Sequence, residues 1–124
     1  MNGSILETTK KLLGLTKDYT AFDTDIIVHI NTVFSNLTQM GVGPDDGFTI
    51  TGYEQEWDDF VTSNSKKTQQ IQTYVYLKVK MMFDPSANSN ITEAINKTLA
   101  ELEYRLFIEE DLSKSLPLDE EEDN

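Results

Sequence analysis

The 124-residue chain has no cysteine, a single histidine, a single arginine and no long apolar run. Without cysteine, neither a disulfide framework nor a thiolate metal site can form. The lone histidine, His29, argues against a zinc site and against a Ser-His-Asp site, for which the sequence offers no partner set. No apolar stretch approaches the roughly 18 residues that suggest a membrane span, so we expect no contact with a membrane.

Basic residues are also scarce, since 10 lysines and arginines stand against 22 aspartates and glutamates and give a net charge of −12. Tight binding to nucleic acid needs basic side chains that displace counterions from phosphates, and the helical segments show no basic stripe. Residues 109–124 hold eight of the acidic residues against one lysine, Lys114. A run of like charge repels itself and cannot bury apolar area, so we expect an acidic, disordered and flexible C-terminal tail at 110–124 behind one helical domain at 1–109.

The spacing of apolar residues predicts an all-α protein, a small bundle of about four to five helices. The segment Ser4–Glu7 has the pattern of a capping box, and Ile26, Ile30, Val33 and Leu37 fall on one helix face. The first expected helix runs from Ser4 to Gly14, and the second runs from a cap at Thr20, Asp23 or Thr24 to Gly41. A short third helix opens with a capping box at Thr51 and continues through Trp57 to Phe60. The last two helices run from about Lys67 to Phe83 and from Asn90 to about Glu109.

Residues 41–53 are rich in glycine, proline and aspartate, which indicates a loop. The segment from Phe48 to Thr51 also suits one arm of a short hairpin, so we expect a mid-chain loop or short hairpin. Exposed loops of this length often carry contacts. The candidate residues of this docking loop are Pro44, Asp45, Asp46, Phe48, Ile50 and Tyr53.

The helix expected at 67–83 carries large apolar side chains on more than one face. A helix of this kind is either the centre of a small bundle or a surface that waits for a partner. If the second apolar stripe is not ordinary core, it is a candidate surface for lateral assembly between copies of the chain. Its residues are Tyr76, Val79, Lys80 and Phe83.

Glu54, Glu56, Asp58 and Asp59 form an acidic cluster. A small hydrolase with a divalent metal held here is one interpretation, but the spacing does not match an EF-hand loop. Glu54 and Asp58 would be i, i+4 neighbours on a helix, so a solvated acidic face is the better interpretation. We therefore expect no catalytic residue, no metal and no cofactor.

Three segments stand in a characteristic order along the chain. They are Ile5-Leu6 with Lys11-Leu12-Leu13-Gly14-Leu15, then Tyr74-Val75-Tyr76-Leu77-Lys78-Val79-Lys80-Met81-Met82-Phe83-Asp84-Pro85, then Glu101-Leu102-Glu103-Tyr104-Arg105-Leu106. Together they resemble the head–tail connector family of tailed bacteriophages and prophages, over about residues 4–108. The apolar-basic helix that ends in Phe-Asp-Pro is, with the helix that follows it, the most specific part of the resemblance.

The resemblance implies a small, mostly helical structural subunit without enzymatic activity. Members of the family assemble into a ring, commonly of twelve subunits, that docks beneath the portal protein, extends the DNA channel and provides a platform for the next head-completion protein or the tail. Such a subunit belongs to the head–tail junction of the virion and, during assembly, to the cytoplasm of the bacterial host. DNA would pass through the ring without specific binding, and the docking loop becomes a candidate channel surface. The acidic segment at 110–124 departs from the family pattern, and its role stays open between gripping the portal and hanging free.

The composition leaves a second function open, that of an acidic DNA mimic that inhibits a nucleic-acid-binding protein. Such an inhibitor would bind a basic protein in a strongly salt-dependent manner. The apolar second face argues against it, because a mimic needs charge rather than Tyr76, Val79 and Phe83.

Overall fold

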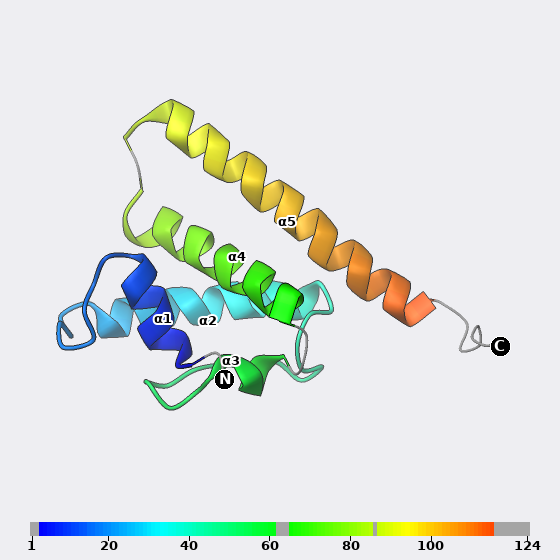
Figure 1. Cartoon of the computed structure of the whole chain (residues 1–124), viewed down its shortest axis with the longest axis horizontal. Helices are drawn as coiled ribbons and strands as arrows, with labels where there is room; N and C mark the ends of the chain where they lie inside the picture. Colours follow the sequence, from blue (N-terminus) through cyan, green and yellow to red (C-terminus); the bar gives the residue numbers. More distant parts are fainter. Residues whose placement is uncertain (1–2, 62–64, 86, 116–124) are drawn as a thin grey trace.

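The computed structural model describes residues 3–61, 65–85 and 87–115. Five helices lie in these ranges, α1 (Ile5–Leu12), α2 (Asp23–Gln39), α3 (Trp57–Phe60), α4 (Ser65–Phe83) and α5 (Ser89–Ser115) (Figure 1). The same ranges contain no strand, although an isolated antiparallel bridge joins Ser4 to Glu56. The prediction of an all-α bundle is confirmed, and the mid-chain segment forms a loop rather than a hairpin.

Helix α4 lies between α2 and α5 and contacts both of them (Figure 1). Its side chains Ile71, Tyr74, Val75 and Val79 are buried in the core. Two apolar faces are what a helix needs when neighbours cover it from two sides, so α4 is the centre of the bundle. One candidate assembly residue is corrected by this arrangement, because Val79 is fully buried in the core of its own subunit and offers no surface to a partner.

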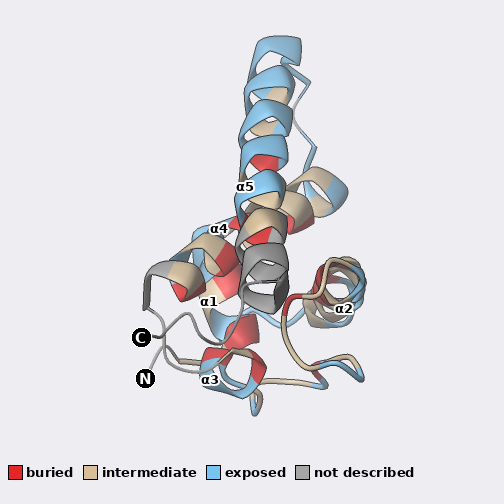
Figure 2. Ribbon diagram, turned by 90° about the vertical axis from the view of Figure 1, so that its right-hand side faces the viewer, coloured by how far each residue is buried: buried red, intermediate tan, exposed pale blue. Residues whose placement is uncertain are grey.

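Helix α5 packs on α4 through its middle part, where Leu99 and Leu106 are buried. Tyr74 of α4 donates a hydrogen bond from its Oη to Glu103 Oε2 at 2.7 Å. Burial raises the pKa of Tyr74, and the Glu103 carboxylate raises it further. The N-terminal half of α5 is mostly exposed, including Ile91, because this half of the helix extends beyond the rest of the bundle (Figure 2).

The described part of α5 continues to Ser115, whereas the prediction ended the helix near Glu109. Residues 110–115 are therefore helical. The rest of the predicted tail, residues 116–124, lies outside the described residues. Among the helices of the described chain, none combines the length and the apolar character that crossing a bilayer requires.

Helix α3 is shorter than expected and starts at Trp57, so the predicted capping box at Thr51 is wrong. Gln55 bonds to Thr51 instead: its Oε1 accepts a hydrogen bond from Thr51 N–H at 2.9 Å, and its Nε2 donates to Thr51 Oγ1 at 3.0 Å. The helix cap lies at Glu56, whose backbone N–H donates to Asp59 Oδ2 at 2.8 Å. The Gln55 side chain thus occupies both the backbone N–H and the hydroxyl of Thr51, and Thr51 does not cap the helix.

Aromatic rings close the mid-chain loop onto the core. The ring centroid of Phe34 in α2 lies 4.5 Å from that of Phe60 and 5.4 Å from that of Phe48. Gly43 lies against Phe60 with φ at +89°, a backbone conformation that favours glycine. A Cβ atom at this position would overlap the Phe60 ring, so the close approach of loop and α3 requires glycine here.

We expect Gly43→Ala to lower the free energy of unfolding by about 2–4 kcal/mol, because the backbone strains alanine and the added Cβ overlaps the Phe60 ring. Gly47→Ala is the matched control, since its φ is +94° but no atom lies within 4 Å of the added Cβ. We expect this control to lose only about 1–2 kcal/mol, the strain of the backbone alone. Urea unfolding followed by circular dichroism measures both values, and equal losses would contradict a role for the Phe60 contact.

Candidate assembly surface

The structure separates the six residues predicted for the docking loop. Ile50 is held from α2 by Asn31, whose Oδ1 accepts a hydrogen bond from Ile50 N–H at 2.7 Å and whose Nδ2 donates to Ile50 O at 3.0 Å. The loop is therefore fixed to the core through its apolar residues and turns its acidic residues outward. The two exposed residues are Asp45 and Asp46. The three half-buried residues are Pro44, Phe48 and Tyr53, and the buried residue is Ile50.

An acidic surface covers this loop and α3. Residues 41–61 contain six acidic residues and no basic one, and all six are exposed. Across the part of the chain that the structure describes, no three or more histidine, cysteine, aspartate or glutamate side chains are grouped so that they could hold a metal ion. The acidic surface is made up of Asp45, Asp46, Glu54, Glu56, Asp58 and Asp59.

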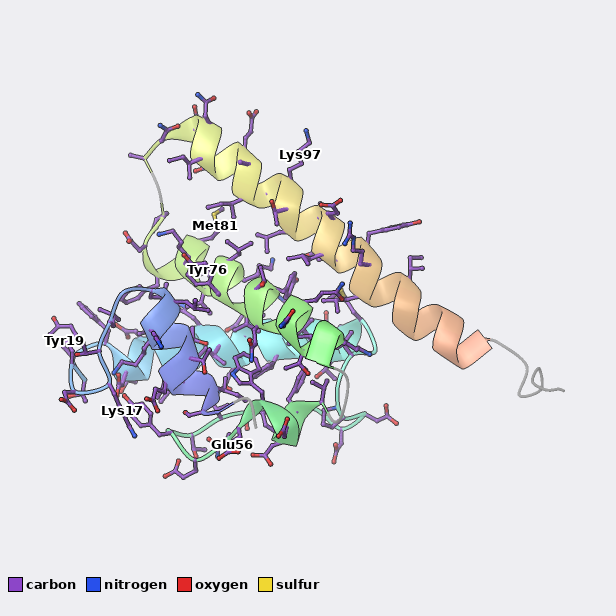
Figure 3. The ribbon with its side chains drawn as sticks, in the orientation of Figure 1. Lys17, Tyr19, Glu56, Tyr76, Met81 and Lys97 are labelled. Atoms are coloured by element: carbon purple, nitrogen blue, oxygen red, sulfur yellow. The ribbon has the colours of Figure 1, made fainter. Side chains whose placement is uncertain are left out.

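Three aromatic rings form a row at the end of the molecule where α1 connects to α2 and where α4 ends. Tyr19, in the connection, meets the ring of Phe22 edge-to-face at a centroid distance of 5.8 Å. Phe22 in turn meets Phe83, the last residue of α4, at 5.2 Å. Tyr19 is 48% exposed and Phe22 is 39% exposed, and Figure 3 shows Tyr19 at the outer edge of its loop. We call Tyr19, Phe22 and Phe83 the aromatic ledge.

Other large apolar side chains are exposed near the same end of the molecule. Leu12 lies at the end of α1, Met82 lies next to the end of α4, and Ile91 lies near the start of α5. These helix ends lie on one side of the molecule in Figure 1. Contiguous exposed apolar groups mark sites of protein–protein contact, and the aromatic ledge is the part of this region whose side chains contact one another.

Two residues of the predicted lateral face belong to this region. Phe83 is part of the aromatic ledge, and Lys80 lies one turn earlier on α4, where its Nζ is 3.9 Å from Asp84 Oδ2. Tyr76 is half-buried further back along α4 (Figure 3). The assignment of Tyr76, Lys80 and Phe83 to an assembly surface stays a prediction.

The spacing of apolar residues did not predict that Tyr19 and Phe22 belong to this surface. Both stand in a short polar stretch between Asp18 and Asp23 that belongs to no apolar stripe of the expected helices. Two aromatic residues that belong to no apolar helix face were the signal in the sequence for an exposed aromatic surface. Their contact with Phe83 depends on how α2 and α4 pack, which the spacing of residues does not reveal.

A buried ammonium group holds the loop that carries Tyr19. The side chain of Lys10 in α1 is fully buried, and its Nζ lies 2.7 Å from Asp23 Oδ1 at the start of α2. The same Nζ donates hydrogen bonds to Tyr53 Oη at 2.7 Å, to Tyr19 O at 2.8 Å and to Lys17 O at 3.1 Å. Tyr53 Oη donates in turn to Asp23 Oδ2 at 2.8 Å. One side chain thus ties α1, the α1–α2 loop, α2 and the mid-chain loop together.

The pKa values of this cluster shift in the directions that stabilise the ion pair. Burial by itself would lower the pKa of Lys10, but the hydrogen bonds with Asp23 and Tyr53 and the charge of Asp23 raise it above its ordinary 10.5. Burial by itself would raise the pKa of Asp23, but the hydrogen bonds and charge of Lys10, with the hydrogen bond from Tyr53, lower it below its ordinary 3.8. Burial raises the pKa of Tyr53, so its hydroxyl keeps the proton that it donates to Asp23.

A small helical bundle with a rigidly held apolar ledge and a separate acidic surface is typical of a protein that assembles with other proteins. Residues 5–113 match the family model described as "Phage connector protein". No curated protein and no solved structure matches the chain. The family match covers most of the sequence, so the chain belongs to the phage connector protein family. The resemblance to head–tail connectors is thereby confirmed, and the chain has the general role of a phage connector protein, which interacts with other structural proteins of the phage.

We expect Lys10→Met to lower the free energy of unfolding by about 3–5 kcal/mol, because Asp23 loses its only cationic partner among the described residues while its carboxylate stays largely buried. Lys11→Met is the matched control on the same helix, where the side chain is exposed, and we expect a change within about 0.5 kcal/mol. Chemical unfolding of both variants measures the difference. A loss for Lys10→Met no larger than that of the control would contradict the anchoring role of the ammonium group.

The ion pair also predicts how stability depends on pH. The quantity to measure is the difference in the free energy of unfolding between the native chain and the double variant Lys10→Met/Asp23→Asn. Folding lowers the pKa of Asp23, so its contribution is complete above pH 3.8 and is lost as the pH falls through the lowered value. Folding raises the pKa of Lys10, so its contribution is complete below pH 10.5 and is lost as the pH rises through the raised value. We expect the stability difference to be constant between about pH 5 and pH 9 and to shrink at both extremes. A difference that varies across neutral pH would show that other groups control it.

Proposed function

We propose that this connector protein is a structural subunit, without enzymatic activity, of a ring at the head–tail junction of the virion. The ring docks beneath the portal protein, extends the DNA channel and provides a platform for the next head-completion protein or the tail. Twelve subunits are the number that the resemblance to head–tail connectors implies. The subunit is present in the cytoplasm of the bacterial host while particles assemble.

The aromatic ledge is the observation that carries this proposal. The described part of the chain covers both faces of α4 but leaves Tyr19 and Phe22 exposed. Burying apolar surface gives roughly 25 cal/mol per Å², and aromatic side chains provide much of the affinity of protein interfaces. A partner that covers the ledge therefore stabilises an assembly in which the subunit is one part.

The acidic surface supports the part of the proposal that concerns DNA. Duplex DNA must move through a connector without being held, and carboxylates repel its phosphates. We propose that the exposed acidic residues of the mid-chain loop, Asp45 and Asp46, face the channel or the docking partner. Ile50 and Phe48 contribute by holding the loop on the core.

Light scattering across a concentration series, with and without purified portal, tests the ring. We expect weak, concentration-dependent association of the protein alone and ring formation with the portal, and electron microscopy of the mixture would show the number of subunits. The portal alone, in the same buffer, is the control. A protein that stays strictly monomeric at high concentration and ignores the portal would contradict the proposal.

A further inference from the structure

We infer that the aromatic ledge of one subunit binds the outer face of α5 of the next subunit, centred on Tyr104. The inference rests on the proposed ring and adds to it the two surfaces that meet. By the outer face of α5 we mean the stripe of residues on the side away from α4, at the spacing i, i+3, i+7, i+11 and i+14. These residues are Asn90, Glu93, Lys97, Glu101 and Tyr104.

Tyr104 is 67% exposed, a larger fraction than any other large apolar side chain among the described residues. It is exposed because Leu99 and Leu106 turn the opposite side of the helix toward α4. Figure 3 shows Lys97, on the same stripe, pointing away from α4. A shallow hollow lies along the N-terminal part of the stripe and is lined by residues that include Glu93 and Lys97. Among the described residues, none therefore covers the outer face of α5, which carries an aromatic residue near one end.

The ledge and Tyr104 cannot meet within one subunit. The ledge is built by the α1–α2 connection and the end of α4, whereas Tyr104 lies on the side of α5 that faces away from α4, about 20 Å along the helix from Ile91. A contact between them joins two different surfaces of two copies. Such a heterologous, head-to-tail contact generates a ring when the rotation between neighbours closes.

The charges around the two surfaces complement each other. Lys17 and Lys80 flank the ledge, and Glu101 lies one turn from Tyr104 on the outer face of α5. Each of these charges already has an exposed partner in its own subunit: Lys17 lies 3.8 Å from Glu7, Lys80 lies 3.9 Å from Asp84, and Glu101 lies 3.3 Å from Arg105. Exposed pairs of this kind are weak, so they can be exchanged for contacts across an interface at little cost.

The end of α4 and the helix α5 also carry net charges of opposite sign. Residues 78–85, which form the end of α4 and the residues after it, carry two lysines and one acidic residue. Residues 89–106 of α5 carry three acidic and two basic residues. Within the subunit the two helices already pair, since Lys78 Nζ lies 3.8 Å from Glu103 Oε2. The inferred contact repeats this attraction between the end of α4 in one copy and α5 in the next.

Phe22→Glu and Tyr104→Glu, separately and mixed, test the inference under conditions in which the native protein assembles. Each variant alone has one damaged surface, so we expect association to weaken about 30-fold or more and each to run as a monomer. The equimolar mixture contains one intact ledge and one intact α5 face per pair. We therefore expect it to form a one-to-one dimer that grows no further, as measured by light scattering after size-exclusion chromatography.

Val28→Glu is the matched control, because Val28 is an exposed apolar residue of α2 outside both surfaces, and this variant should assemble like the native chain. All three substituted residues are exposed, and circular dichroism melting curves verify that the variants fold. If Tyr104→Glu assembles normally, or if the mixture stays monomeric, the inferred contact is wrong, while rings of the native protein keep the proposed function intact. If the native protein forms no ring with or without the portal, both the proposed function and the inference fail.

Discussion

Helix α4 carries apolar side chains on two faces, and keeping both from water requires a neighbour on each side. Helices α2 and α5 provide this cover, and Tyr74 and Val79 are buried as a result. The rest of the architecture follows from that requirement, because α5 must lie along α4 with only one of its own faces. The apolar groups that remain exposed are then found mainly at the helix ends and on the outer side of α5.

A second constraint, the buried Lys10 ammonium, connects this core to the assembly surface. Removing an ammonium group from water costs several kcal/mol unless oxygen atoms replace the lost hydration. Asp23, Tyr53 and the backbone carbonyls of residues 17 and 19 supply those oxygens. The same contacts fix the loop that positions Tyr19. A ledge that is ordered before binding loses less entropy when a partner covers it, which favours assembly.

Charge is distributed unevenly over the subunit, and the distribution separates two roles. The mid-chain loop and α3 present carboxylates without a basic residue, which suits a surface that repels phosphate. The ledge combines aromatic rings with flanking lysines, which suits contact with another protein. The apolar and acidic surfaces are built by different segments of the chain, so each can meet a different neighbour.

The sequence by itself determined the helical class, most of the helices and the membership of the connector family. Periodic apolar residues such as Ile26, Ile30 and Val33 define a helix face locally, and the motif around Tyr74–Pro85 is contiguous, so both can be recognised without a fold. Only the tertiary structure decided which apolar side chains are core and which are surface. Val79 and Phe83 belong to the same predicted stripe, yet one is buried and the other joins Phe22 in the ledge. That outcome depends on where α2 and α5 cross α4, and the crossing is set by packing between residues far apart in the sequence. The buried partners of Lys10 were hidden for the same reason, because Asp23 and Tyr53 approach it only after the loops have closed.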